Sequence, residues 1–566
     1  MTVNAPVARG ESEPYYELGS YHRPVDTPSP QARVWFDRGL IWAYAFNHEE
    51  AIRCFARALD ADPGLAIARW GIAYAIGPNY NKAWDAFDPV DLAASLARAR
   101  SELRDAADGR ASPVERGLIE ALQTRFPTAD PDDADALLAG HSAYADAMVA
   151  LAKDYPDDVD VAALAADALV NVTAWALWDT KTGAPSPGSR VVQAARILED
   201  ALATPGGREH PGVLHVYLHA MEMSATPEDA LPAADLLRGL VPDAGHLQHM
   251  PSHIDVLCGD YRSSVASNQA AVQADRRFVE REGPLNFYSL YRAHNLHFVV
   301  YSAMFQGQSQ VALQAAEELA QQLTPELLSV ASPPMADWLE AFVPLRVHVL
   351  VRFGRWDELI AEPLPADVDL YCTTAATLHY GRGVAHAATG QLTQARAERE
   401  AFTQAYARIP DSRYLFNNTS RDILAIAGVM LDGEIAYREC KFDEAFARLR
   451  RAIELSDALP YDEPWGWMQP PRHAYGALLL EQGHVEQAAA VYAADLGIDA
   501  TLSRPCQHPG NVWSLHGYHE CLQRLGRTVE AASVGQQLAL AEAHADVPIL
   551  ASCACRLEVT APRCGD

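Results

Sequence analysis

The chain has 566 residues, of which 49% are hydrophobic and 21% are charged, a composition that excludes a disordered or collagen-like polymer. Its 45 Lys and Arg residues against 74 Asp and Glu residues give a net charge of -29, which argues against nucleic acid or an anionic membrane as partner. Its 9 cysteines are mostly solitary, its start lacks a signal-like apolar segment, and no run of about 18 apolar residues occurs, which together predict a cytoplasmic protein without a membrane span.

The first residues, 1–30, are rich in proline and tyrosine and are predicted to form an extended arm. From residue 31 onward, apolar residues recur at helical spacing, with almost no period-two alternation. Helix stops such as the sequence DPG also recur along the chain. We therefore predict an all-α fold.

The first helical segment, starting at Ala32, fits a unit of 34 residues. Small residues stand where two antiparallel helices would approach closely, large residues where they would fill the gap, and a proline where the second helix would end. The matching residues are Trp35, Gly39, Trp42, Ala51, Phe55, Ala58 and Pro63. This pattern resembles the tetratricopeptide repeat, from which only Arg38 departs, since that family usually carries leucine there.

The resemblance implies an α-α superhelix, a tetratricopeptide-like solenoid of roughly eight to ten helical pairs, over residues 31–545. Each pair would bury its apolar face only by stacking on its neighbours. The same register can be laid on Gly383 with Ala395, Gly433 with Ala445, and Gly476 with Ala488.

Two segments fall outside the repeat. Residues 174–190, rich in Gly, Pro and Ser, predict a loop insertion that covers a groove. Its candidate lid residues are Trp175, Trp178 and Asp179. Residues 546–566 are predicted to be a carboxy-terminal tail, in which Cys553, Cys555 and Cys564 form a loose thiol group.

Histidines recur with the period of the repeat. His215 and His219 are four residues apart, and so are His249 and His253, which follow 34 residues later. Both pairs therefore occupy positions 5 and 9 of the first helix of their units. The same stripe of positions 2, 5 and 9 also holds His246, His294, His297 and Tyr301.

The resemblance implies that this stripe lines the concave groove of the superhelix. Side chains four apart on a helix have Cβ atoms about 5–6 Å apart, and packed helices lie about 8–10 Å apart, so rings from adjacent units can reach one ion. The predicted metal ligands are His215, His219, His246, His249, His253, His294 and His297. The predicted catalytic residues are Glu222, as a ligand or general base, and Tyr301. Further candidates are His348, His473 and His516.

An imidazole site suits a transition metal ion and excludes calcium or magnesium as the natural occupant. Copper or iron, which we favour, would make the protein a metal-dependent oxidoreductase acting on a small-molecule substrate. Zinc would instead make Glu222 the base to a metal-bound water, in a hydrolase or lyase.

Two other interpretations stay open. A groove-facing histidine in such a repeat usually hydrogen-bonds a peptide or a neighbouring helix, and duplication of a unit would copy a structural histidine. The commonest role of this fold is a scaffold that binds a peptide or protein partner. Such grooves usually carry Lys, Arg and Asn, whereas this stripe carries imidazoles with tyrosines beside them.

Beyond the general repeat, three segments resemble a group of bacterial tetratricopeptide proteins of similar length. They are HPGVLHVYLHAMEMS, LPAADLLRGLVPDAGHLQHMPSHI and HNLHFVVYSAM, and the likeness runs from about Tyr15 to about His519. The resemblance implies a shared fold and a shared histidine site, and it leaves the reaction open.

Overall fold

The computed structural model describes residues 15–556. Its regular structure there is helical, apart from one two-stranded antiparallel sheet that pairs β1 (Tyr414–Leu415) with β2 (Asn418–Thr419). The all-α prediction is confirmed. Within residues 15–556, none of the helices has the length and apolar character needed to traverse a bilayer.

The chain forms two compact units. Unit 1 consists of Met1–Ile254 and Ala270–Arg292, and unit 2 of Asp255–Gln269 and Ala293–Asp566. Three helices have residues in both units: α13 (Pro251–Cys258), α14 (Tyr261–Glu282) and α15 (Ser289–Phe305).

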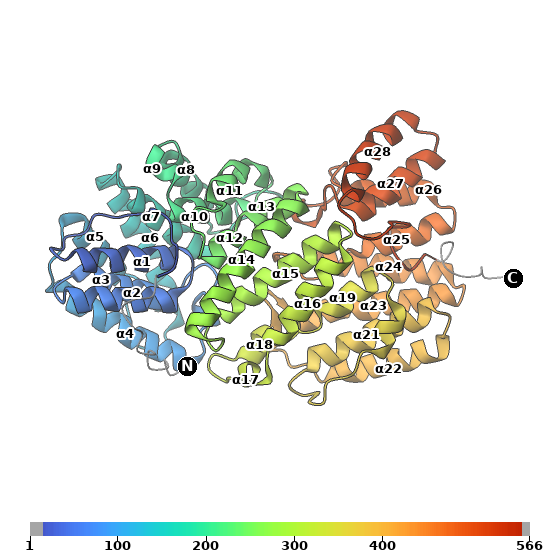
Figure 1. Ribbon diagram of the computed structural model, residues 1–566, viewed down its shortest axis with the longest axis horizontal. Coiled ribbons are helices and arrows are strands. Elements are labelled where there is room, and N and C mark those ends of the chain that lie inside the picture. The colour runs from blue at the N-terminus through green and yellow to red at the C-terminus, as the bar shows by residue number, and fades with distance from the viewer. Residues whose placement is uncertain (1–14, 557–566) are drawn as a thin grey trace. The chain divides into compact units, whose positions relative to one another are not determined.

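In unit 1, helices α1 to α8 pack in chain order, each on the next, and α10 packs on α7, α8 and α1 (Figure 1). The first helix of the unit is thereby placed beside a helix more than 150 residues later. The elements are α1 (Pro30–Tyr44), α2 (His48–Ala61), α3 (Ala66–Ile76), η1 (Trp84–Ala86), α4 (Pro89–Ala107), α5 (Pro113–Gln123), α6 (Ala134–Asp154), α7 (Val159–Val170), η2 (Asn171–Thr173), α8 (Val191–Leu202), α9 (Pro205–Arg208), α10 (Pro211–Glu222), η3 (Pro227–Ala230), α11 (Leu231–Leu237) and α12 (Gly245–His249).

Phe55 of α2 fills the space between α1 and α3. A Cβ atom added at Gly39 of α1 would lie 2.5 Å from the Phe55 ring, and one added at Gly71 of α3 would lie 2.7 Å from it. Both helix backbones therefore press against the same ring, which is fully buried. The register predicted for this first repeat is confirmed.

Residues 15–29 contain no helix and are held to unit 1 by a buried ion network. Arg23 donates two hydrogen bonds to Asp158, at 2.8 and 3.1 Å, and lies 2.8 Å from Asp160. Asp160 also accepts from the Tyr44 hydroxyl at 2.7 Å and from His210 Nε2 at 3.0 Å. Residues 1–14 of the predicted arm lie outside the described part of the chain.

Residues 174–190 contain no helix and are anchored to α10. Trp178 Nε1 donates to the carbonyl oxygen of Ala220 at 2.7 Å. The Asp179 carboxylate accepts from two backbone N–H groups within its own turn, so it supports the loop's shape.

Unit 2 stacks helical hairpins. The pairs α21/α22, α23/α24, α25/α26 and α27/α28 each pack internally and on the next pair (Figure 1). A Cβ atom at Gly433 would lie 3.2 Å from Leu449, and one at Gly476 would lie 2.5 Å from Tyr492, so the close approach seen in the first repeat recurs. The elements are α16 (Ser309–Gln322), α17 (Pro325–Leu328), α18 (Met335–Leu339), η4 (Glu340–Phe342), α19 (Leu345–Arg352), α20 (Trp356–Ala361), α21 (Cys372–Ala388), α22 (Leu392–Ala407), α23 (Ser420–Arg438), α24 (Phe442–Asp457), α25 (Pro471–Glu481), α26 (Val485–Asp495), η5 (Arg504–Cys506), α27 (Val512–Arg524) and α28 (Thr528–Glu542).

Residues 461–470, between α24 and α25, form a buried loop that lies on α19 and α21. The Trp467 ring packs against His348 and Tyr380, with ring centroids 5.0 and 5.5 Å apart. Gln469 Nε2 donates to the carbonyl oxygen of His348 at 2.7 Å. This loop, called the 461–470 loop below, covers a face of the first helices of these hairpins.

Residues 551–556 pack on helices α19 and α25 of the same unit. Ser552 Oγ donates to the carbonyl oxygen of His473 at 2.9 Å, and Arg352 donates to the carbonyl oxygen of Ser552 at 3.0 Å. Cys553 and Cys555 form a disulfide instead of the expected loose thiol group. Cys564 lies outside the described residues.

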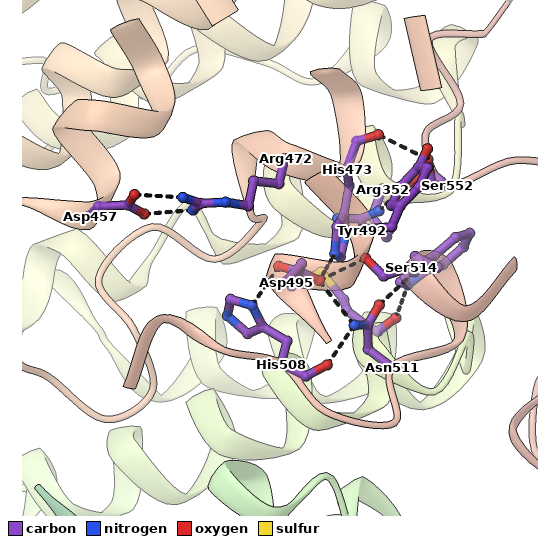
Figure 2. Close-up of polar contacts among 12 residues, drawn as sticks. Arg352, Asp457, Arg472, His473, Tyr492, Asp495, His508, Asn511, Ser514 and Ser552 are labelled. Carbon is purple, nitrogen blue, oxygen red and sulfur yellow. Dashed lines mark hydrogen bonds and ion pairs between the residues drawn. The ribbon is translucent and has the colours of Figure 1, made fainter. Parts of the chain in front are cut away.

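Asp495, at the end of α26, is the centre of a buried hydrogen-bond network in unit 2 (Figure 2). Four side chains donate to its carboxylate: His473 Nε2 at 3.0 Å, His508 Nδ1 at 2.8 Å, Ser514 Oγ at 2.6 Å and Asn511 Nδ2 at 3.1 Å. Arg352 in turn donates to His473 Nδ1 at 3.0 Å. Because four donors satisfy this carboxylate, we interpret the network as structural.

Candidate metal centre

Five of the seven predicted histidine ligands lie together in unit 1, and each of these residues is at most 1% exposed. Helix α10 carries one pair, α12 carries two rings, and α13 carries the last. These residues are His215, His219, His246, His249 and His253. Pro251 starts a new helix without turning His246 away from the others.

The α10 pair presents two ring nitrogens to each other. His215 Nδ1 lies 2.6 Å from the carbonyl oxygen of Tyr44, and His219 Nδ1 lies 2.9 Å from a carboxylate oxygen of Glu222. Because both oxygens can only accept, both Nδ1 atoms carry the proton. The Nε2 atoms are then unprotonated, and they face each other at 3.0 Å. Two opposed lone pairs repel unless a cation lies between or beside them.

Glu222 also orients the second pair. Its other carboxylate oxygen lies 2.9 Å from His253 Nδ1, so His253 likewise turns its Nε2 away from the carboxylate. That Nε2 lies 2.7 Å from His249 Nε2. One buried carboxylate therefore fixes a ring in each pair, an arrangement that resembles the carboxylate–histidine anchoring found around protein-bound metals.

Neither ring nitrogen of His246 has a hydrogen-bond partner within residues 15–556, although this residue is fully buried. Its ring packs against the rings of Phe46 and Tyr291, with centroids 5.4 and 4.8 Å away. One potential ligand atom from each of His215, His219 and His246 lies within 4.8 Å of the others. A buried imidazole without a partner is costly, and a metal ion would satisfy it.

Three of these imidazoles, those of His215, His219 and His246, have lowered pKa values that keep them neutral at physiological pH. Burial lowers the pKa of His215 to about 3, and burial and the neighbouring imidazoles hold the pKa values of His219 and His246 well below their ordinary range. Neutral imidazole is the form that binds metal ions, so no proton must be displaced before ligation.

Aromatic rings enclose the cluster. Phe46 packs on His215 at 4.5 Å between centroids, and Tyr80 packs on His219 at the same distance. The ring centroid of Trp175, from the 174–190 loop, lies 6.4 Å from that of His219, and the role of this loop as a lid stays a prediction. Phe46 and Tyr80 were not predicted from the sequence, because nothing in the repeat register relates them to α10.

The other predicted residues lie in unit 2. The His297 ring lies near Phe342, and the His294 ring near Phe416, with centroids 5.2 and 4.6 Å apart. Tyr301 packs on Phe305 at 4.5 Å, and burial raises the pKa of its hydroxyl. Of the further candidates, His348 and His473 are buried, and His516 is partly exposed. His473 belongs to the Asp495 network.

The donor set in unit 1 fits a transition metal. Bonds of about 2.0–2.1 Å separate two tetrahedral ligand nitrogens by about 3.3 Å. The Nε2 atoms of His215 and His219 are 3.0 Å apart and those of His249 and His253 are 2.7 Å apart, so each pair would open slightly around a shared ion. Five imidazoles and one carboxylate are ligands that copper, iron and zinc accept, while calcium and magnesium require oxygen.

One comparison with known protein families agrees with the repeat predicted at the start of the helical region. A family model of the tetratricopeptide repeat matches residues 32–65, the unit that starts at Ala32. No curated protein matches the sequence. Among solved structures, the chain is similar to the human IFIT1 dimer with PPP-AAAA, at 12% identity and a TM-score of 0.32 over 90% of this chain and 96% of that one. It is also similar to yeast Tom70, at 10% identity and a TM-score of 0.27 over 90% of each chain. The finer resemblance to bacterial proteins with the histidine motifs stays a prediction.

Proposed function

We propose that this helical-repeat protein binds a transition metal in the unit 1 cluster, with Glu222 anchoring both histidine pairs. The observation that carries the proposal is the pair of opposed Nε2 atoms of His215 and His219, 3.0 Å apart, each with its Nδ1 proton held by an oxygen acceptor. A hydrogen bond cannot join two unprotonated nitrogens, but a bound cation can.

Each residue around the cluster would have its own role at such a site. Glu222 and the Tyr44 carbonyl oxygen hold the tautomers and orient the rings, while Phe46 and Tyr80 exclude water. Because both Glu222 oxygens accept from imidazole Nδ1 atoms, we assign Glu222 a positioning role in place of general base. This weakens the hydrolase or lyase alternative.

A nitrogen-rich, water-excluding set favours copper or iron, with zinc as the remaining option. Copper or iron would supply one-electron chemistry with oxygen, which is why an oxidoreductase acting on a small organic molecule is the enzyme class we propose. Trp175 and the 174–190 loop would then cover the centre.

A scaffold for a peptide or protein partner is the second candidate. It is supported by the tetratricopeptide match at residues 32–65, because partner binding is a common role of that repeat. In unit 2, however, the 461–470 loop already lies on α19 and α21. A partner that used this face would have to displace Trp467, which is 1% exposed.

Metal analysis of the full-length, tag-free chain tests the proposal. We expect about one or two equivalents of a transition metal per chain, retained on gel filtration and lost in a His219→Ala/His253→Ala variant that keeps its helical circular dichroism. His386→Ala is the control, since this partly exposed histidine belongs to unit 2 and is none of the cluster's residues. Metal content equal in wild type and double variant would refute the metal centre. Stoichiometric peptide binding by the metal-free chain would then favour the scaffold.

A further inference from the structure

A chain of aromatic rings in unit 1 leads away from the histidine cluster. The Tyr291 ring packs edge-on against His246, with ring centroids 4.8 Å apart, and stacks on the Tyr288 ring at 5.3 Å. Tyr288 in turn contacts Phe278 of α14, with centroids 5.2 Å apart. Each of these three aromatic residues is at most 5% exposed, so this inner half of the chain of rings is closed to solvent.

The outer half continues to the surface of unit 1. The Phe278 centroid lies 6.1 Å from those of both Trp42 and Tyr16, and the Trp42 and Tyr16 rings are 5.2 Å apart. Tyr16 contacts Tyr15 at 5.0 Å, and Tyr15 contacts Trp35 at 5.2 Å. Trp42 and Tyr16 are buried, whereas Tyr15 and Trp35 are partly exposed. These rings and the three inner ones, called the aromatic path below, therefore connect the histidine cluster with solvent.

Nearly every ring of the aromatic path can lose a single electron. Tyrosine and tryptophan are the aromatic side chains that are most easily oxidised, and Phe278 is the only ring of the path that is neither. Neighbouring centroids lie between 4.8 and 6.1 Å apart, within the range of about 4.5–7 Å that is usual for aromatic pairs in contact. Electrons tunnel readily between rings in contact and across one intervening ring. The aromatic path therefore offers a route for single electrons between the surface and the cluster.

Carboxylates are placed to accept the protons that oxidation of this path releases. An oxidised tyrosine is strongly acidic, so it gives up its phenol proton to a nearby acceptor. The Tyr15 hydroxyl donates to Oε1 of Glu50 at 2.6 Å. The Tyr16 hydroxyl donates to Oε1 of Glu282 at 3.4 Å. The outer tyrosines can therefore be oxidised and reduced again without exchanging protons with solvent.

The outer end carries two arginines in a chain whose net charge is -29. The Arg38 guanidinium lies over the rings of Tyr15 and Trp35, 4.0 and 4.4 Å from their centroids. Arg57 lies over the Trp35 ring at 4.5 Å. Two cations beside the partly exposed rings attract an anion, so the electron donor that fits this end is an anionic small molecule.

We propose that the aromatic path carries single electrons from an anionic reductant at Tyr15 and Trp35 inward to the metal centre, a role that rests on the proposed function. An oxidising equivalent that oxygen chemistry leaves at the centre without substrate takes an electron from Tyr291, and each ring is then reduced by the next one outward. Tyr15 passes its proton to Glu50 when it gives up its electron. The reductant, such as an enediolate, then loses one electron to Tyr15, and the proton returns from Glu50. One electron enters and one oxidising equivalent is consumed, so the protein is left unchanged.

Photochemical oxidation of the metal-free, full-length chain tests the path without any metal. A ruthenium polypyridyl complex is attached through Val34→Cys, an exposed position next to Trp35, and peptide mass spectrometry confirms the label site. A flash in the presence of a sacrificial electron acceptor converts the label to a one-electron oxidant. A fluorotyrosine replaces Tyr291, because its radical has an EPR spectrum distinct from that of tyrosine. We expect a fluorotyrosyl signal in samples frozen after the flash.

Two substitutions interrupt the path. We expect Tyr15→Phe and Tyr288→Phe each to lower the signal from position 291 at least about tenfold, which corresponds to a barrier higher by about 1.4 kcal/mol. The matched control is Tyr144→Phe, since this fully buried tyrosine of unit 1 is not part of the path. Absence of the fluorotyrosyl signal, or equal signals in the two path variants and the control, would overturn the proposal.

Loading the chain with Cu(I) separates this proposal from the proposed function. Bound Cu(I) is the next electron donor beyond Tyr291, so it should quench the fluorotyrosyl signal and give a Cu(II) spectrum. An unquenched signal in a chain that metal analysis shows to be loaded would overturn the link between the path and the centre. If metal analysis finds no metal, the proposed function fails, and the signal at position 291 still decides whether the path conducts.

Discussion

The carbonyl oxygen of Tyr44 lies 2.6 Å from Nδ1 of His215, which follows it by 171 residues. This bond joins the end of α1 to α10, the helix that carries the first histidine pair. This bond fixes the His215 tautomer. A contact from the first repeat of unit 1 therefore leaves Nε2 of His215 facing the cluster. A metal site here is therefore assembled by packing between distant helices.

Glu222→Gln tests the anchoring carboxylate. An amide cannot accept from two imidazole Nδ1 atoms as a carboxylate does, so both rings lose orientation and basicity. We expect metal affinity to fall about 10–100-fold, measured by competition with a chromophoric chelator. Glu434→Gln, a buried glutamate paired with Arg438 in unit 2, is the control. Unchanged affinity in Glu222→Gln would show that the carboxylate does not support a metal.

His246→Leu should stabilise the metal-free chain. The substitution removes a buried imidazole that has no partner, which costs about 1–3 kcal/mol, and leaves an apolar side chain against Phe46 and Tyr291. We expect a higher melting temperature without metal and a smaller rise on adding metal.

His210→Leu is the matched control for that experiment. His210 is also buried, but it donates to Asp160 at 3.0 Å and accepts from the Val213 N–H at 3.2 Å. Removing satisfied bonds should lower the melting temperature. If both variants lower the melting temperature of the metal-free chain equally, the unpaired ring nitrogens of His246 do not destabilise the fold.

The repeat period was enough to predict the all-α fold and the face on which several of the histidines lie. Side chains at the same position of successive first helices face the same way, which is why the rings of His219 and His253 come together, with centroids 5.8 Å apart. Their metal ligation stays a prediction. The register gives the face of the helix on which a residue lies but not its partner. His473, one of the further candidates from the sequence, lies in the Asp495 network instead.

Residues outside the period could not be found from the sequence. Tyr80 and Phe46 reach the cluster from turns, and Met468 reaches His297 from a loop 171 residues later. Such contacts depend on the packing of long loops against helices, which no local sequence pattern encodes.

Gly39→Ala should destabilise unit 1 by about 1–3 kcal/mol, even though alanine favours a helix more than glycine does. The new Cβ would lie 2.5 Å from the Phe55 ring, which cannot retreat because Gly71 presses on it from α3. Combining Gly39→Ala with Phe55→Leu should cost less than the sum of the two single changes. Additive losses in chemical denaturation would contradict the shared contact.

Lowering the pH should destabilise unit 2 through His473. Burial lowers the pKa of this ring to about 4 in the folded chain, whereas an unfolded histidine titrates near 6.5. The unfolded state therefore binds the proton first, so the stabilising contribution is complete above about pH 6.5 and is lost as the pH falls toward 4. Asp495 keeps its charge throughout this range, because its histidine partners hold the pKa of its carboxyl well below the usual value. The full loss is about 3 kcal/mol.

His473→Gln separates the contribution of His473 to acid destabilisation from that of the other buried histidines. The glutamine amide can donate to Asp495 and accept from Arg352, as the neutral ring does, but it does not titrate. The melting temperature of the full-length chain, followed from pH 7.5 to 4.5, should fall less steeply in the variant than in the wild type. Parallel pH profiles would mean that His473 titrates alike in the folded and unfolded chain, and the buried network would then contribute nothing to acid sensitivity.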